Sequence, residues 1–316
     1  MKARFHLPNF TNHFMFNLTF VEMLSHCPHY FREGVEIASI YGTFPPAVWN
    51  GGRLQTGRCD ESFVKQVLSE FNKRGVPLRF TFTNPMLEEE HLKDEFCNRI
   101  LQLADNGLNE CIVASPLLED YLRTNYPNFK LTSSTCKRIT NPEKLVAETE
   151  KDYHIVVIDY DLNHNYDALE KIEDKSKCEI LVNACCEPKC PYRSAHYRSI
   201  GKQQILYSAH VRNNPEVPFD FESTVAETGF KNGSFNCEYM EYSLFQVKDL
   251  ANHITPDEIW NKYIPMGFEQ FKIEGRTFDN LNLIEHYMYY MIKPEYRDEA
   301  RFIFMKQLTR NKVVLN

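Results

Sequence analysis

The sequence predicts an α/β protein built as a single (β/α)8 barrel of the TIM type. About eight short β-rich segments alternate with charged segments of helical periodicity. Eight strand–helix units are what a closed parallel barrel requires, and 316 residues suit such a barrel with insertions. The main alternative, an open doubly wound sheet, would need a Gly-rich phosphate-binding motif after its first strand, and none is present there. No Pro/Ser-rich linker divides the chain, so we expect one domain over residues 1–316.

Eight segments carry the strand prediction because they are short, rich in aliphatic and aromatic residues and bounded by turn-forming residues. In chain order they are Ala3–Leu7, Val35–Tyr41, Leu78–Phe82, Glu110–Ala114, Lys130–Ser133, His154–Asp159, Glu179–Val182 and Phe268–Ile273. Helical periodicity dominates several of the segments between them. The helical candidates include Glu61–Lys73, Glu88–Leu103, Pro142–Lys151 and Tyr166–Lys175.

Glycine, asparagine and proline residues at the ends of the predicted helices support these boundaries. Gly75, Gly107 and Gly267 stand where a helix would end before the next strand. Asn141 followed by Pro142 predicts a helix start, with the asparagine as the cap. Residues 192–246 show no clear strand–helix alternation. We therefore expect them to form a long insertion between the seventh and eighth strands.

The composition is that of an ordinary globular protein, with 43% hydrophobic and 25% charged residues. No run of about 18 apolar residues predicts a membrane span, and the N-terminus lacks the pattern of a cleaved signal, so we expect a cytoplasmic protein. The net charge of −7 has the wrong sign for a protein that wraps duplex DNA. A local basic pocket is compatible with this balance. The sequence gives no oligomeric state.

The last predicted strand carries the first candidate site. Its side chains alternate, so that Phe271 and Ile273 share one face while Lys272 and Glu274 share the other. The outer face of a parallel barrel packs on helices and is apolar, which sends Lys272 and Glu274 inward. Arg276 follows beside glycine, and Thr277 could cap the next helix, so we expect an anion site here. The alternative is that Lys272 and Glu274 simply neutralise each other.

Other polar residues follow predicted strands, where the working residues of such barrels lie. Arg53 and Arg58 each follow glycine after the second strand and could bind a carboxylate or phosphate, or belong to a surface loop. Asp159 ends the sixth strand and is a candidate for proton transfer or for helix capping. Asn84, before Pro85, could contact substrate or shape a turn.

The ten cysteines include a cluster after the seventh strand. Cys186 and Cys190 are separated by three residues in a Pro-containing loop and could bind one metal centre with Cys237 and a further ligand. Cys185, Cys59 or Cys136 could complete four thiolates, and His196 is a nitrogen alternative. Such a set suits zinc or an iron–sulfur cluster, and the spacing does not separate the two. Buried free thiols and a redox dithiol are the alternatives.

Several motifs resemble the collagenase-like peptidase family of unassigned catalytic type. The run from Met266 to Arg276 resembles its Gly-x-x-x-x-Lys-Ile-Glu-Gly-Arg signature. A second segment resembles the Asn-x-x-Cys-x-x-x-Cys-Pro-x-Arg-x-x-His pattern of its smaller bacterial branch, through Asn183, Cys186, Cys190, Pro191, Arg193 and His196. Asp249–Leu250 and the early Tyr41–Gly42 and Gly52–Arg53 elements extend the likeness over most of the chain. The usual His-Gly after the seventh strand and the later Tyr-Ser-Gly-x-Cys are missing.

The resemblance implies a function and a ligand set. Relatives are identified as iron–sulfur proteins of oxygen-independent hydroxylation, acting on ubiquinone precursors or RNA bases. By resemblance Cys186, Cys190 and Cys237 would be ligands of an iron–sulfur cluster of the 4Fe-4S type, with Cys185 as the fourth candidate.

Three functions follow. The first is iron–sulfur-dependent hydroxylation or a related tailoring reaction, with Lys272, Glu274 and Asp159 as catalytic candidates. Arg276, Arg53, Arg58, Asn84 and Asn183 are its substrate-binding candidates. The second is a metal-dependent peptidase or hydrolase. The third is a zinc-stabilised binding or scaffold protein without turnover. The expected partner of an enzyme is a small anionic or aromatic substrate, with an RNA base as one candidate.

Overall fold

The computed structural model describes residues 2–221 and 242–315. Eight strands follow one another in chain order as a closed barrel, and the pairings between neighbouring strands are parallel. The predicted α/β barrel is therefore confirmed. The chain divides into two compact units, with residues 1–41, 139–189 and 238–316 in unit 1 and residues 42–138 and 190–237 in unit 2. The expectation of one domain stays a prediction.

Unit 1 contains both ends of the chain and five of the strands. Strand β1 pairs with β2 and β8, and β7 pairs with β6 and β8. Its strands are β1 (Ala3–Pro8), β2 (Val35–Gly42), β6 (Ile155–Val157), β7 (Cys178–Leu181) and β8 (Gln270–Lys272). Its α-helices are α1 (Phe14–His26), α6 (Pro142–Thr149), α7 (Tyr166–Glu170), α10 (Leu244–Val247), α11 (Pro256–Glu258), α12 (Ile264–Met266), α13 (Asn280–Met291) and α14 (Arg297–Arg310). Short 3-10 or π turns are η1 (Pro28–Tyr30), η3 (Tyr160–Leu162), η4 (Lys175–Lys177), η6 (Ile259–Tyr263) and η7 (Pro294–Tyr296).

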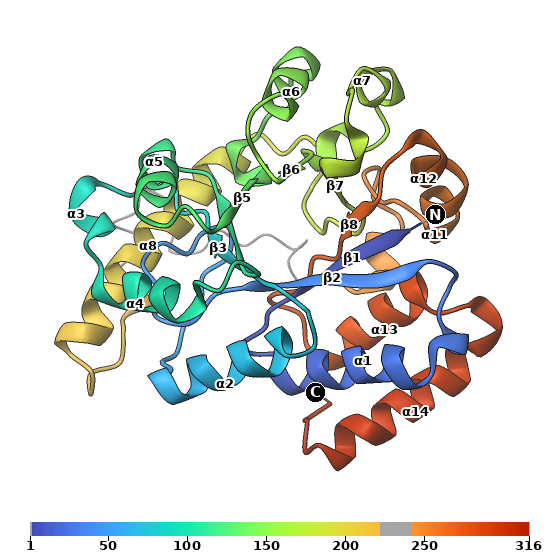
Figure 1. The fold of residues 1–316 in the computed structure, drawn as a ribbon, viewed down its shortest axis with the longest axis horizontal. Helices are drawn as coiled ribbons and strands as arrows, with labels where there is room; N and C mark the ends of the chain where they lie inside the picture. Colours follow the sequence, from blue (N-terminus) through green and yellow to red (C-terminus); the bar gives the residue numbers. More distant parts are fainter. Residues whose placement is uncertain (1, 222–241, 316) are drawn as a thin grey trace. The chain divides into compact units, whose positions relative to one another are not determined.

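Apolar side chains on the outer face of the unit 1 strands pack against helices. Phe5 of β1 contacts Phe271 of β8 and stacks with Trp260 of η6, with ring centroids 5.9 and 6.2 Å apart. Helices α1, α13 and α14 lie side by side, although they come from opposite ends of the sequence (Figure 1). Phe20 and Phe304 join α1 to α14 through an edge-on ring contact at 5.2 Å. This packing fixes which face of β1 and β8 points away from the helices.

Unit 2 contains three neighbouring strands and the longest helix among the described residues. Strand β4 pairs with both β3 and β5. The elements are β3 (Leu78–Phe82), β4 (Glu110–Val113), β5 (Lys130–Ser133), α2 (Glu61–Asn72), α3 (Glu89–Leu92), α4 (Glu95–Ala104), α5 (Pro116–Asn125), α8 (Arg193–Asn213) and η2 (Thr135–Lys137). Phe80 and Phe82 pack with Phe44 and Trp49 on one face of β3. The opposite face carries Arg79, which is fully buried.

Local sequence signals account for most of the boundaries. Every predicted strand is present, with ends that differ by at most two residues. Gly75, Gly107 and Gly267 have φ values of 72°, 74° and 104°, where a residue without a Cβ is favoured. The Asn141 side chain accepts a hydrogen bond from Lys144 N at 2.9 Å, as the predicted helix cap requires.

Two helix expectations need correction, and one long helix was not predicted. The segment predicted as one helix over Glu88–Leu103 forms α3 and α4, because Asp94 caps α4 by accepting a hydrogen bond from Cys97 N at 2.8 Å. The helix predicted over Tyr166–Lys175 ends at Glu170. The segment expected to be a long insertion, for which the sequence showed no clear strand–helix alternation, contains the 21-residue helix α8. Its polar and apolar residues are weakly segregated, so its periodicity is hard to detect in the sequence.

Candidate active site

A layer of buried polar side chains lies on the inner face of β1, β7 and β8. Lys272 Nζ is 3.1 Å from Glu179 Oε1, and His6 Nε2 is 3.4 Å from Glu179 Oε2. His6 also lies 2.7 Å from Ser39 Oγ through Nδ1 and 3.1 Å from Gln270 Oε1 through Nε2. Glu179 has no exposed surface and His6 is 2% exposed. This layer holds a carboxylate between an ammonium group and an imidazole.

Lys272 points inward, as its position in the last strand predicts. Its ammonium group also lies 4.1 Å from the centre of the Tyr41 ring. The Tyr41 hydroxyl donates a hydrogen bond to Ile273 O at 2.7 Å, which fixes the ring over the lysine. The partner of Lys272 is Glu179 rather than Glu274. The alternation of a single glutamate with aliphatic residues in the seventh strand was the signal that could have identified it.

Glu274 is held just beyond the end of β8. Asn183 is fully buried, donates from Nδ2 to Glu274 O at 2.9 Å and accepts from Glu274 N at 2.6 Å. The Glu274 side chain accepts a hydrogen bond from Cys185 N at 3.2 Å through Oε2. This hydrogen bond joins the end of β8 to the start of the segment that contains Cys185, Cys186 and Cys190, which we call the cysteine loop. Both ends of the Asn183 amide are engaged with the Glu274 backbone. The contact of Asn183 with substrate stays a prediction.

The expected anion site after Gly275 has a different local structure. Helix α13 begins at Asn280 and is capped by Asp279, which accepts from Asn282 N at 2.7 Å. A carboxylate therefore already occupies the position at which Thr277 was expected to cap the helix. Arg276 is half-buried, and its carbonyl accepts a hydrogen bond from Asn9 Nδ2 at 2.9 Å.

Asp159 is buried at the end of β6 and serves as a cap. Its Oδ1 accepts a hydrogen bond from Asp161 N at 3.0 Å at the start of η3. Asp161 in turn accepts from Lys189 N at 2.8 Å, which ties the far end of the cysteine loop to this segment. The capping alternative for Asp159 is thus observed directly. Its role in proton transfer stays a prediction.

The cysteine loop begins within unit 1. Cys185 is buried, and the half-buried Cys186 packs against Tyr160, Leu181 and Ala184. Cys190, also buried, belongs to unit 2, and Cys237 lies outside the described residues. In residues 2–221 and 242–315, no group of three or more His, Cys, Asp or Glu side chains is arranged to hold a metal ion. The four-thiolate set therefore stays a prediction that depends on Cys237.

The remaining substrate-binding candidates lie in unit 2 and contact the backbone. Asn84 is fully buried and donates to Val48 O and to Gly201 O of α8, at 2.9 and 3.0 Å. Arg58 donates to Val211 O at 3.0 Å and to Pro215 O at 2.6 Å, near the end of α8. Arg53 donates to Gly52 O at 2.9 Å. These contacts hold loops and α8 together.

His196, the nitrogen alternative for a metal, lies in the first turn of α8. Burial lowers the pKa of its imidazole to about 4, and the positive charge of Arg53 acts in the same direction. The ring is consequently neutral near pH 7, which is the state in which an imidazole coordinates a metal.

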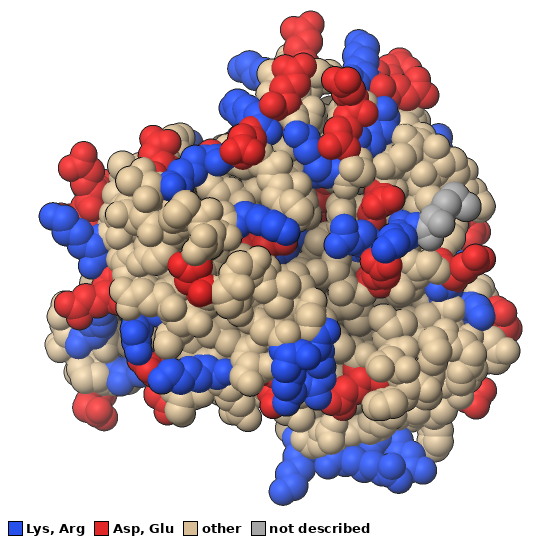
Figure 2. Space-filling view, viewed as in Figure 1, with Lys and Arg blue, Asp and Glu red and all other residues tan. Residues whose placement is uncertain are grey.

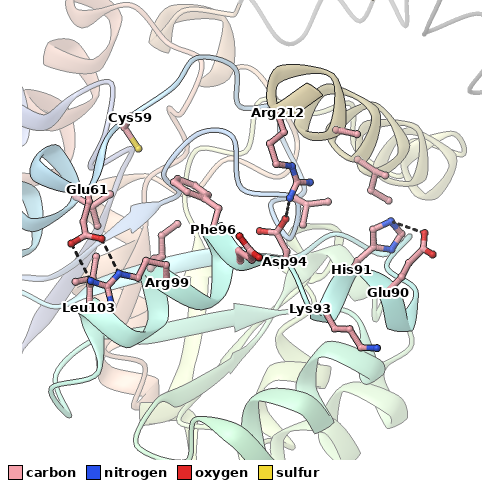
Figure 3. A pocket seen from close by; sticks show the side chains of 16 residues that line it. Cys59, Glu61, Glu90, His91, Lys93, Asp94, Phe96, Arg99, Leu103 and Arg212 are labelled. Carbon is pink, nitrogen blue, oxygen red and sulfur yellow. Dashed lines mark hydrogen bonds and ion pairs between the residues drawn. The ribbon is translucent and has the colours of Figure 1, made fainter. Parts of the chain in front are cut away.

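A cavity of about 770 Å³ lies in unit 2, between α2, α4 and α8 (Figure 3). Its apolar wall includes Val64, Phe96 and Ile205. Two ion pairs border it: Arg212 with Asp94, and Arg99 with Glu61 at 2.8 Å. Glu90, Lys93 and Glu95 also line the cavity, so its charges are of both signs and do not indicate one class of substrate. The sequence motifs did not identify it.

Two known proteins that are similar to this chain are named a protease and a peptidase. No known protein family pattern matches the chain. The chain is 25% identical over 248 residues to the uncharacterized protease MJ1657 of Methanocaldococcus jannaschii, and the match covers 77% of this chain and 68% of that protein. This similarity supports the resemblance to a peptidase family. Among solved structures, the U32 peptidase Mk0906 matches with a TM-score of 0.49 and 16% identity, over 87% of this chain and 94% of that one.

Two further observations bear on partners. In the described residues, none of the helices is both long enough and apolar enough to cross a bilayer. Figure 2 shows basic and acidic side chains over much of one face, with a group of basic side chains at its lower edge.

Proposed function

We propose that the chain is an enzyme of the collagenase-like peptidase family that works where β7 and β8 end. The observation that carries this proposal is the hydrogen bond from Cys185 N to Glu274 Oε2, at 3.2 Å. It joins the cysteine loop to the carboxylate that follows the buried Lys272. Residues at the carboxyl ends of barrel strands are where such folds carry out chemistry.

The chain's own residues support proton transfer near an anionic group. Glu274 is half-buried, and its backbone is fixed by Asn183, so its carboxylate is positioned to hold or move a proton. Lys272 supplies a positive charge that Glu179 partly neutralises and orients. His6 Nε2 lies 3.4 Å from the other Glu179 oxygen and helps to orient it. We expect the substrate to be a small anionic or aromatic molecule.

Iron–sulfur-dependent hydroxylation is the first candidate reaction. An iron–sulfur cluster would supply electrons that no side chain can provide. Thiolates are the donors that such a cluster prefers, and Cys186 and Cys190 lie close in sequence, but the described residues alone do not complete a ligand set. On the family resemblance we propose Cys186, Cys190 and Cys237 as the ligands, with Cys185 as the fourth candidate.

Hydrolysis of a peptide bond is the second candidate. The similarity to a protein named a protease favours it. In this reaction the Glu274 carboxylate would accept a proton from water, and Lys272 would stabilise negative charge on the substrate. A zinc ion held by the cysteines without turnover is the remaining outcome.

Anaerobic activity measurements on the full chain separate these functions. Denatured collagen and casein peptides are incubated with the wild type, with Glu274→Gln and with Cys186→Ala, and cleavage is followed by mass spectrometry. Lys306→Gln, an exposed change on α14, is the matched control. Cleavage lost in Glu274→Gln but retained in Cys186→Ala supports hydrolysis. No cleavage by a protein that contains iron and sulfide supports the redox function, and a colourless zinc protein without cleavage contradicts both enzymatic candidates.

A further inference from the structure

Three cations gather around two aromatic rings on the helical side of unit 1. We call this set the Tyr289 cation cluster: Arg32, Lys248 and Arg297, with the rings of Tyr289 and Trp260. Lys248 Nζ lies 4.2 Å from the centre of the Tyr289 ring, and Arg297 Cζ lies 5.3 Å from it. Arg32 Cζ lies 5.2 Å from the centre of the Trp260 ring.

The cluster is separate from the proposed active site. Trp260 stacks on Phe5 of β1, whereas the neighbouring His6 belongs to the polar layer on the opposite face of that strand. The cluster is built by segments outside the barrel strands: the link between η1 and β2, the residue that follows α10, the π turn η6, the end of α13 and the start of α14. Its rings and guanidinium groups are partly exposed, and Lys248 is exposed, so a ligand can reach them.

The three cations lack a neutralising partner among the described residues. None of them forms an ion pair with a carboxylate, and the Nε atoms of Arg32 and Arg297 are buried without a hydrogen-bond acceptor. Arg297 makes one side-chain hydrogen bond, from Nη2 to Tyr289 O at 3.0 Å. Ring faces attract cations but carry no full negative charge. The positive charge of the cluster is therefore only partly compensated.

The nearby acidic residues either interact with other groups or form no ion pair with the cluster. Glu285 binds Arg301 through both of its oxygens, at 2.8 and 3.1 Å. Glu258 accepts hydrogen bonds from Thr255 at the start of α11. Asp257 and Glu295 influence Arg32 electrostatically without pairing with it.

The positive charges of the cluster lower the pKa values of their neighbours. Burial lowers the pKa of Arg32, and the charge of Arg297 lowers it further. Burial and then Arg297 act in the same way on the pKa of Lys248. Each observation indicates that an anion would stabilise this arrangement.

We propose that the Tyr289 cation cluster binds a phosphoryl group of a soluble ligand. Two guanidinium groups and one ammonium group match the charge and the several acceptor oxygens of a phosphate better than those of a single carboxylate. The Tyr289 and Trp260 rings border the cations and would contact an organic portion of the ligand. A phospholipid headgroup presents the same chemistry, and the experiment below separates the two sources.

Binding of inorganic phosphate and of glycerol 3-phosphate to the full chain, measured by isothermal titration calorimetry at constant ionic strength, tests this proposal. We expect saturable binding that Arg297→Gln or Lys248→Gln weakens about tenfold or more, since each removes charge-assisted contacts. Arg297→Lys, which retains the charge, should weaken it less. Lys306→Gln, on the same helix but outside the cluster, should bind like the wild type.

Two controls keep the result interpretable. Circular dichroism spectra must match the wild type, so that weaker binding reflects the site rather than misfolding. Sedimentation with vesicles of phosphatidic acid and of phosphatidylcholine tests the lipid source. No saturable phosphate binding by the wild type, equal affinity in Arg297→Gln, or binding only to phosphatidic acid vesicles would overturn the proposal of a soluble ligand. The proposed active site is unaffected by any of these results.

Discussion

Replacing Lys272 by methionine tests how strongly the buried polar layer depends on its ion pair. The change retains much of the side-chain volume and removes the ammonium group that lies 3.1 Å from Glu179, a carboxylate with no exposed surface. His6 stays 3.4 Å from the other Glu179 oxygen. Removing one member of a buried pair costs about 3–5 kcal/mol, because the other charge stays buried without compensation. We therefore expect the free energy of unfolding of Lys272→Met to fall by about that amount.

Urea denaturation of a double-mutant cycle measures this effect. Lys272→Met combined with Glu179→Leu removes both charges and should be less than about 2 kcal/mol below the wild type. Lys2→Met is the matched control, since Lys2 pairs with Glu36 at an exposed position and should cost less than about 1 kcal/mol. An equal cost for Lys272→Met and Lys2→Met, or additive effects of Lys272→Met and Glu179→Leu, would show that the buried ion pair does not stabilise the fold.

Three further predictions concern stability and are checked by urea midpoints. Burial lowers the pKa of His253 and of His286 to about 4, so the unfolded chain binds more protons than the folded chain between about pH 6.5 and pH 4. The free energy of unfolding should therefore fall as the pH drops through this range. His286→Gln should make this fall less steep, and an unchanged slope would contradict the prediction. Gly201→Ala should cost about 1–3 kcal/mol, because its Cβ would collide with Asn84 Oδ1 and lie 3.1 Å from Met86 Cγ; a neutral effect would show that α8 can shift freely. Asp94→Ala should cost about 1–2 kcal/mol through loss of the α4 cap, with Asp94→Asn costing less, and equal losses would argue against a capping role.

The strands and several helix ends were predictable because their signals are local. Short apolar runs define the strands, and positions such as Gly75 and Asn141 satisfy backbone requirements that few other residues meet. The division between α3 and α4 was missed because Asp94 is both a possible helical residue and a strong cap. Only the folded backbone shows which role it takes.

The site was predictable in part. The alternation of the last strand correctly sent Lys272 inward, but its partner, Glu179, lies 93 positions earlier in the chain, and no local pattern links the two. The contact between Cys185 and Glu274 likewise depends on the register of two neighbouring strands. The Tyr289 cation cluster draws on five separate segments, and its residues form no motif in the sequence.

The metal content of anaerobically purified protein tests most directly whether the cysteine loop and Glu274 form one working site. Iron and acid-labile sulfide are measured per chain in the wild type, in Cys186→Ala and in the control Cys27→Ala, whose thiol lies at the end of α1. We expect iron and sulfide in the wild type and the control, with loss of both in Cys186→Ala. Wild-type protein without iron, or iron retained at the same level in Cys186→Ala, would contradict it.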